Sequence, residues 1–217
     1  MVIRRKSSKG DGGPATRQRI LDSAREIFAL RGFERVTMRD IAHAIRYTPA
    51  TIYLHFRDKA TLLRELVEQD FLALSARFHK LSGLEDPVER LREMGYMYVE
   101  FGLAYPNHYR LLFMTAHTES IARAGSGPLT LGEGSPERDV YAFLMATVEE
   151  CLATGKFRPE YRNVEQVSQM LWAAMHGVVA LSITKGDDPW ITWKSPTRTV
   201  ALLIDTLLRG ALASPEE

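Results

Sequence analysis

Hydrophobic residues recur at helical spacing along most of this 217-residue chain, and no stretch alternates between apolar and polar positions as a strand does. Within residues 16–31, for example, Ile20, Ala24 and Phe28 lie on one stripe. The pattern predicts helices at about 16–31, 37–45, 48–56, 59–81, 87–105, 107–114, 135–155, 164–184 and 196–212. We therefore expect an all-α fold of about nine helices.

The residues that flank these stripes are typical helix caps. Thr37, with Asp40 three residues later, forms a variant of the capping box, and Thr48 precedes Pro49, which suits the first helical position. Residues 37–56 thus predict a helix, a tight turn and a second helix. Small domains use this arrangement to place a helix in the DNA major groove.

Other breaks between the helices are equally marked. Gly32 and Gly155 are expected to end helices, and Ser135 and Asn163 are expected to begin them. Residues 117–135 form the longest predicted loop, and a loop of this length is usually functional or disordered.

Charge is distributed unevenly along the chain. The net charge is +1, but residues 1–60 hold 13 Lys or Arg and six Asp or Glu and carry +7, which leaves −6 on the remainder. Residues 1–13 are polar, basic and rich in Gly and Ser, which predicts a disordered arm. The arm is either an inert tail or a source of phosphate contacts. Such asymmetry is expected where one end of a protein meets a polyanion.

Two C-terminal segments are too apolar for ordinary surface helices. Residues 164–184 and 196–212 carry apolar side chains beyond a single stripe. The simplest way to bury both is against the same helices of a second subunit, because two-fold dimers are the commonest oligomers. Packing within the monomer is the alternative. We expect a homodimer through these two helices.

Composition narrows the functional classes. The single cysteine, Cys151, cannot pair within the chain, and no cysteine–histidine cluster offers a metal site, so neither metal nor cofactor is expected. We find no secretory signal and no apolar run near the roughly 18 residues that span a bilayer, so a cytoplasmic protein without membrane association is expected. No phosphate loop, His-Glu-x-x-His motif or nucleophile elbow occurs, which argues against an enzyme.

Residues 14–74 contain a set of positions in a fixed register: Ile20, Leu21, Asp22, Ser23, Ala24, Phe28, Gly32, Phe33, Val36, Thr37, Met38, Arg39, Asp40, Ile41, Ala42, Thr48, Thr51, Ile52, Tyr53, His55, Phe56, Lys59, Leu62 and Leu63. Through these residues the segment resembles the DNA-binding domain of the TetR/AcrR family of transcriptional repressors. The chain departs from the family at Arg46 and Ala50, where Gly is common. Arg46 must therefore accept a positive φ, or the turn must change shape.

The resemblance implies three parts in the chain. These are the arm at 1–13, a helix-turn-helix DNA-binding domain at 14–74 with its motif at 37–56, and a larger helical effector-binding and dimerisation domain at 75–217. In this last part, Trp172, His176 and Gly177 resemble the Trp-x-x-x-His-Gly motif of one family subgroup.

The same resemblance implies a DNA-contacting surface. Its candidates are Thr37, Arg39, Arg46, Thr48, Pro49, Ala50, Thr51, Tyr53, His55 and Lys59. Pro49 and Ala50 have no hydrogen-bonding side chain, so thymine methyl groups are their expected partners. Tyr53 and His55 resemble the family's phosphate-contacting pair. Lys59 lies in the first turn of a predicted helix, where the dipole disfavours a cation, and a nearby phosphate would explain it.

Several of these residues also have a structural interpretation. Thr51 is alternatively an ordinary helix residue, and His55 a buried structural imidazole. Because the second helix of the motif starts with few donors, we expect sparse direct reading of bases. More of the specificity then falls to Arg39, Arg46 and the shape of the DNA.

The family also implies a small-molecule effector held among the later helices. The candidate lining is apolar and rich in flexible methionine and aromatic side chains, with two histidines as polar anchors. Its residues are Met94, Tyr98, Phe101, Met114, His117, Tyr141, Met145, Trp172 and His176. This set is alternatively plain core, and His176 a satisfied core histidine beside Gly177, where Gly would allow close helix packing. An apolar or aromatic effector is expected.

The sequence therefore predicts a ligand-released repressor that binds a palindromic operator as a homodimer. A ligand-responsive activator and a helical small-molecule-binding protein without DNA function are the alternatives.

Overall fold

The computed structural model describes residues 13–115 and 135–213, which fall into two compact units. The first unit comprises residues 1–69 and 110–129, and the second comprises residues 70–109 and 130–217. The arm predicted at 1–13 lies almost entirely outside the described residues, and so does nearly all of the loop predicted at 117–135.

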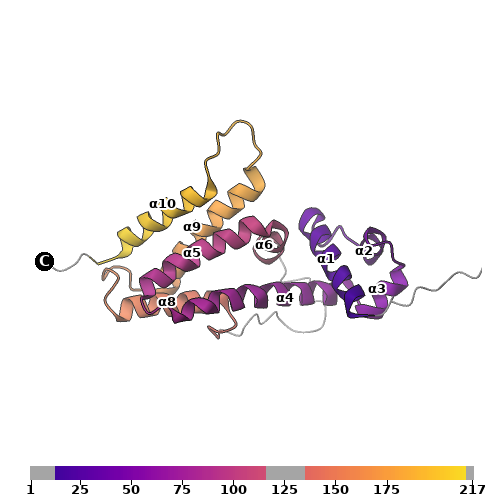
Figure 1. The fold of residues 1–217 in the computed structure, drawn as a ribbon, viewed down its shortest axis with the longest axis horizontal. Coiled ribbons are helices and arrows are strands. Elements are labelled where there is room, and N and C mark those ends of the chain that lie inside the picture. Colours follow the sequence, from indigo (N-terminus) through magenta and orange to yellow (C-terminus); the bar gives the residue numbers. More distant parts are fainter. Residues whose placement is uncertain (1–12, 116–134, 214–217) are drawn as a thin grey trace, which may run out of the picture. The chain divides into compact units, whose positions relative to one another are not determined.

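The described residues contain nine α-helices and no strand, which confirms the all-α prediction (Figure 1). The helices are α1 (Pro14–Arg31), α2 (Met38–Ala44), α3 (Pro49–His55), α4 (Lys59–His79), α5 (Pro87–Ala104), α6 (Pro106–Phe113), α8 (Val140–Ala153), α9 (Val164–Lys185) and α10 (Pro196–Ala211). A short 3-10 helix, η1 (Lys80–Gly83), follows α4, which continues from the first unit into the second.

The first unit is built around the apolar stripes that the sequence predicts. Ile20, Phe28, Ile41, Ile52 and Phe56 are almost completely buried, and they come from α1, α2, α3 and the residue that follows α3. The first turns of α4 join this core through buried leucines. Because α2 and α3 have only seven residues each, they would be marginal alone in water, and burial against the neighbouring helices stabilises them.

Predicted caps fix the ends of these helices. The Thr37 hydroxyl accepts a hydrogen bond from the Asp40 N–H at 3.2 Å, while the Thr37 N–H donates to the Asp40 carboxylate at 2.8 Å, so the capping box is confirmed. The hydrogen bonds from Thr37 lower the pKa of the Asp40 carboxyl. Gly32 ends α1 as predicted, with φ 79°, and its N–H donates to the Phe28 carbonyl.

The second unit is organised around α5, which packs against α8, α9 and α10. Gly95 and Gly102 make this close approach feasible. A Cβ at Gly102 would lie 2.4 Å from Val179 Cγ1 on α9, and one at Gly95 would lie 2.7 Å from Ile204 Cδ1 on α10. Neither glycine was recognised from the sequence, because helical spacing alone does not show which neighbour a small residue admits.

One sequence expectation in this unit is wrong. Ser135 does not begin a helix: residues 135–138 form a turn, and α8 begins at Val140 because the Asp139 carboxylate accepts hydrogen bonds from the N–H groups of Tyr141 and Ala142. At Gly177, which the alternative interpretation of His176 linked to close helix packing, a Cβ would meet nothing within 4 Å among the described residues of this chain.

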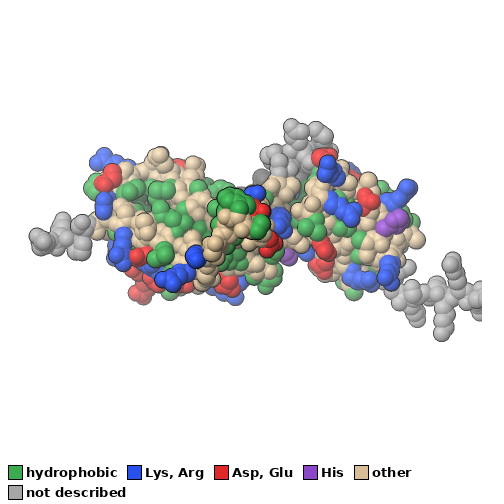
Figure 2. Space-filling view, turned by 90° about the horizontal axis from the view of Figure 1, so that it is seen from above, with side chains coloured by type: hydrophobic (Ala, Val, Ile, Leu, Met, Phe, Trp, Pro, Cys, Tyr) green, Lys and Arg blue, Asp and Glu red, His purple; other side chains and the backbone are tan. Residues whose placement is uncertain are grey.

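The surface of α9, α10 and their connecting loop is rich in exposed apolar side chains. Trp190 is 75% exposed and Leu202 63%, and Leu181 and Trp193 are also exposed. Figure 2, which looks down on this part from above Figure 1, shows hydrophobic side chains gathered there. The expectation that no segment approaches a membrane span is wrong. By length and mean hydropathy alone α9 would be long and apolar enough, and only 22% of its most apolar window is buried within the chain.

Candidate nucleic-acid interface and effector-binding cluster

The turn between α2 and α3 keeps its helix-turn-helix shape with Arg46 in the position usual for Gly. Arg46 adopts φ 60°, which confirms the first of the two expected outcomes. Its N–H donates to the His43 carbonyl at 3.1 Å, and the next N–H, from Tyr47, donates to the Ala42 carbonyl at 2.9 Å. These bonds hold a conformation that costs an L-residue roughly 1–2 kcal/mol. The Arg46 side chain is exposed.

The N-terminus of α3 is held by two threonines. The Thr48 hydroxyl accepts a hydrogen bond from the Thr51 N–H at 3.3 Å, and the two hydroxyl groups lie 3.0 Å apart. Thr51 is buried, so its side chain stabilises the cap and faces the core. This geometry favours the structural interpretation of Thr51 over a contact with DNA. Pro49 occupies the first helical position, as expected, and is half-buried.

The outward face of α3 consists of Ala50, Tyr53 and Leu54. All three are exposed, and they are spaced at i, i+3 and i+4, so they lie on one side of the helix while Ile52 packs into the core on the other. Leu54 is 77% exposed and was missed in the sequence, because a leucine in a helical segment normally indicates the core. His55 is half-buried at the end of α3.

Lys59 begins α4 but points into its own unit. Its Nζ donates to the Phe33 carbonyl at 2.7 Å and lies 4.1 Å above the centre of the Phe33 ring. This pairing supplies a second reason for a cation in the first turn of a helix, beside the predicted phosphate contact. The helix N-terminus itself is capped by Asp58, whose carboxyl pKa is lowered by the hydrogen bond from the Thr61 N–H.

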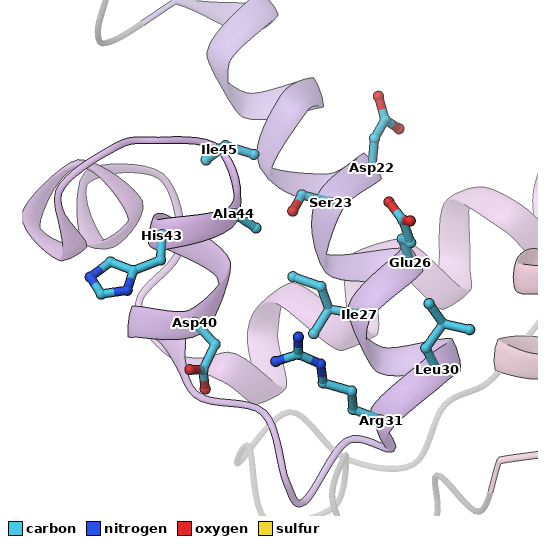
Figure 3. A pocket seen from close by; sticks show the side chains of 10 residues that line it. All are labelled: Asp22, Ser23, Glu26, Ile27, Leu30, Arg31, Asp40, His43, Ala44 and Ile45. Carbon is cyan, nitrogen blue, oxygen red and sulfur yellow. The ribbon is translucent and has the colours of Figure 1, made fainter.

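The remaining cationic candidate, Arg39, is exposed on α2, and the Thr37 hydroxyl is engaged by Asp40. Between α1 and α2 lies a hollow that contains none of the predicted DNA contacts (Figure 3). Its lining includes Asp22, Glu26 and Asp40, and these carboxylates make it unsuited to a polyanion. Ile27 points across its floor toward α2.

In the second unit, four polar groups meet on three helices. The Tyr98 hydroxyl of α5 lies 2.9 Å from the Tyr109 hydroxyl of α6, which lies 2.6 Å from His176 Nδ1 of α9. Trp172 Nε1, also on α9, donates to the Tyr98 hydroxyl at 2.9 Å. We call these four residues the Tyr–His cluster. The imidazole of His176 also stacks on the Tyr109 ring at 5.5 Å.

The Tyr–His cluster is uncharged near neutral pH. Burial lowers the pKa of His176, and burial raises the pKa of Tyr98 to about 12. With His176 neutral, the hydrogen bonds can run from Trp172 to Tyr98, on to Tyr109 and then to Nδ1. In this order each hydroxyl accepts once and donates once, and the remaining imidazole proton is on Nε2.

The other predicted effector residues are only partly brought to this cluster. Tyr141 packs its ring 5.8 Å from that of Trp172, while Met94 and Phe101 are buried in α5 and Met145 is half-buried on α8. Met114 belongs to the first unit, so the structure does not group it with the others. His117 lies outside the described residues.

The capped α2–turn–α3 motif with an exposed second helix, joined to a larger helical unit, defines a helix-turn-helix DNA-binding transcriptional regulator. Residues 20–66 match the family of bacterial regulatory proteins called the tetR family, and residues 91–207 match the tetracyclin repressor-like C-terminal domain. Because the second match alone spans more than half of the chain, this protein belongs to the TetR family.

Known proteins agree with this assignment. The chain is 37% identical to the HTH-type transcriptional regulator UidR of Escherichia coli (strain K12) over 82 residues, which are 38% of this chain and 39% of that relative. The match therefore spans well under half of the curated relative's length.

Two solved structures share the whole fold. The ketosteroid transcriptional regulator KstR2 of Mycobacterium tuberculosis superposes with a TM-score of 0.72 over 93% of this chain and 97% of its own, at 19% identity. FadR from Bacillus subtilis, solved in complex with stearoyl-CoA, has a TM-score of 0.69 over 89% and 98% of the two chains, at 16% identity.

Proposed function

We propose that this regulator is a repressor that binds a palindromic operator as a homodimer and is released by a small apolar or aromatic molecule. The observation that carries the proposal is the α2–turn–α3 motif, whose second helix presents an exposed face from a capped, well-packed core. Residues 14–74 then form the DNA-binding domain, and residues 75–217 the effector-binding and dimerisation domain. The DNA target makes the cytoplasm its place of action.

On the DNA side, the roles divide by chemistry. The exposed cations Arg39 and Arg46 approach phosphates or guanine. The Tyr53 hydroxyl donates a hydrogen bond to a phosphate of the DNA backbone. His55 and Lys59 serve as further phosphate contacts, Lys59 with the donors left over from its bond to Phe33. Thr37 and Thr48 cap α2 and α3, and they place the N-termini of these helices beside the DNA backbone. The basic arm at 1–13 adds phosphate contacts.

The dimer forms through α9 and α10. The exposed leucines and tryptophans of this surface, together with the small buried fraction of α9, support burial against a second copy. Gly177 is open on a single chain, so a partner helix can approach there closely. In a palindromic operator, two recognition helices must match major grooves about 34–36 Å apart.

The effector site is proposed around the Tyr–His cluster and its apolar neighbours. Met94, Phe101, Tyr141 and Met145 supply the apolar wall, and His176 supplies a polar anchor. The stearoyl-CoA complex of FadR supports an apolar ligand in a protein of this fold. The activator alternative has no specific observation in its favour.

The proposal is tested with a thermal-shift screen of apolar and aromatic compounds against the full chain, followed by gel shifts on DNA selected by the protein itself. We expect at least one compound to raise the melting temperature and to release the DNA, because a ligand stabilises the state it binds. If every compound that raises the melting temperature leaves DNA affinity unchanged, ligand release is contradicted. A His176→Phe variant that responds to a releasing compound as the unaltered chain does would contradict an effector site at the Tyr–His cluster.

A further inference from the structure

The outward face of α3 is apolar at its centre, and phosphate contacts do not account for this. Among the large hydrophobic side chains that the structure describes, Leu54 has the greatest exposed fraction. The neighbouring Ala50 and Tyr53 are exposed as well, with Tyr53 at 55%. This face therefore offers a methyl group, a branched alkyl group and an aromatic ring, with the Tyr53 hydroxyl as its one polar group.

The packing of the opposite side fixes this face in place. Ile52 and Phe56 are buried in the core, and Thr51 is tied to Thr48 through its hydroxyl. Rotating α3 to hide Leu54 would expose Ile52, whose burial stabilises the core of the unit. Leu54 is thus held outward by the core of its own unit.

We infer that Leu54 reads the 5-methyl group of a thymine in the major groove, with Ala50 and the Tyr53 ring completing the apolar surface. This inference rests on the proposed placement of α3 against DNA. Thymine is the only one of the four bases that presents an apolar group in that groove, and the other edges present donors and acceptors. An alkyl side chain against those edges would desolvate them without replacing their hydrogen bonds.

Double-stranded DNA, and not a protein partner, is the occupant that the surroundings favour. Residues 1–60 carry a net charge of +7, and Arg39, Arg46 and Arg57 are exposed in the same unit. An apolar centre flanked by cations matches a major groove, where methyl groups lie between two rows of phosphates. The inference therefore predicts a thymine in each operator half-site beneath Leu54.

The expected size of the effect follows from burial of one methyl group. One buried carbon of this kind contributes about 0.8 kcal/mol, which corresponds to about a fourfold change in affinity. A symmetric operator contains two such contacts, so replacing both thymines with deoxyuridine is expected to weaken binding about 15-fold. Deoxyuridine pairs like thymine and lacks only the methyl group, so the substitution isolates this contact.

The test begins with in vitro selection of operator DNA from a random pool by the full chain. Each thymine of the selected site is then replaced in turn by deoxyuridine, and affinity is measured by fluorescence anisotropy. At one position per half-site, we expect the fourfold loss for the unaltered chain and almost no loss for Leu54→Ala. Leu54→Met, which keeps an apolar side chain of similar volume, is expected to restore the discrimination.

Leu30→Ala is the matched control. Leu30 is a 65% exposed leucine on α1 that lines the hollow of Figure 3, so its removal leaves α3 untouched. This variant should discriminate between thymine and deoxyuridine as the unaltered chain does. Thermal unfolding of each variant checks that the fold is unchanged.

Each outcome of this experiment decides something different. If selection enriches no sequence, the proposed function itself fails, and the inference fails with it. If a site is enriched but no deoxyuridine position weakens binding, Leu54 does not read a methyl group. The same conclusion holds if Leu54→Ala retains the full discrimination.

Discussion

At the scale of single residues, Arg46 stands where the chain needs a left-handed backbone conformation. Its φ of 60° costs an L-residue roughly 1–2 kcal/mol, which a glycine would not incur. The exposed guanidinium lies in the turn immediately before α3. We propose that this guanidinium contacts DNA and that the contact offsets the cost of the conformation.

Arg46→Gly separates these two effects. We expect the free energy of unfolding to rise by up to about 1 kcal/mol, because the relief of strain exceeds the entropy cost of glycine. Operator affinity should fall, and the slope of log affinity against log salt should flatten by about two, because each subunit of the proposed dimer loses one phosphate contact. Chemical denaturation and anisotropy titrations measure the two quantities.

Arg46→Ala is the control for this prediction, because alanine loses the charge and keeps the Cβ. It should bind DNA as weakly as Arg46→Gly without the gain in stability. If Arg46→Gly binds the operator as tightly as the unaltered chain, Arg46 makes no contact with DNA.

Residue-level conformations that depend on local geometry were predictable, and long-range contacts were not. The caps at Thr37 and Thr48 follow from a few neighbouring residues, and the family resemblance left a positive φ at Arg46 as one of two outcomes for the turn. The bond from Lys59 to the Phe33 carbonyl joins positions 26 residues apart, and no spacing rule indicates it. Leu54 was missed because its exposure depends on how α3 packs.

At the scale of elements, the second unit depends on the close approach of α5 to its neighbours. Gly102 lies where α9 and the Tyr109 ring both come near the α5 backbone. The Tyr–His cluster is assembled by this packing, because Tyr98, Tyr109 and His176 come from three different helices. The sequence predicted the helices, but it did not indicate which residues let them approach.

Gly102→Ala should therefore destabilise the second unit by about 1–3 kcal/mol, since the new Cβ would lie 2.4 Å from Val179 Cγ1 and 3.0 Å from Tyr109 Cδ2. Urea denaturation measures the change. Gly83→Ala is the control, because a Cβ there meets nothing within 4 Å. Equal stabilities of the two variants would show that α5 and α9 are not closely packed at Gly102.

The Tyr–His cluster also predicts a dependence of stability on pH. Burial holds the pKa of folded His176 below its ordinary value of 6.5, so below that pH the unfolded chain binds a proton that the folded chain does not. Stability contributed by neutral His176 is present above pH 6.5 and is lost as the pH falls toward the lowered pKa.

His176→Gln isolates this contribution, because its amide oxygen still accepts from the Tyr109 hydroxyl but does not titrate. Between pH 7.5 and 5, the unaltered chain should lose more free energy of unfolding than the variant does. Identical losses in urea denaturation would place the His176 pKa at its ordinary value in the folded chain.

At the scale of the whole molecule, the apolar surface of α9 and α10 supports the proposed dimer. Leu202→Glu alters a 63% exposed side chain, so the fold of the single chain should survive, whereas a dimer interface would have to bury two carboxylates. We expect sedimentation equilibrium to show dimers for the unaltered chain and monomers for the variant.

Leu72→Glu is the control for this prediction, because Leu72 is also exposed in the second unit but lies on α4. It should remain dimeric. A dimeric Leu202→Glu variant would move the interface away from this surface.

The most direct test of the account compares the affinity of the full chain for its selected operator with its affinity for a scrambled duplex of the same length, at physiological salt. We expect the operator to bind at least about 10³-fold more tightly, with an even number of chains per duplex. Equal affinities for the two duplexes, or one chain per operator, would contradict a dimeric regulator that reads DNA through α3.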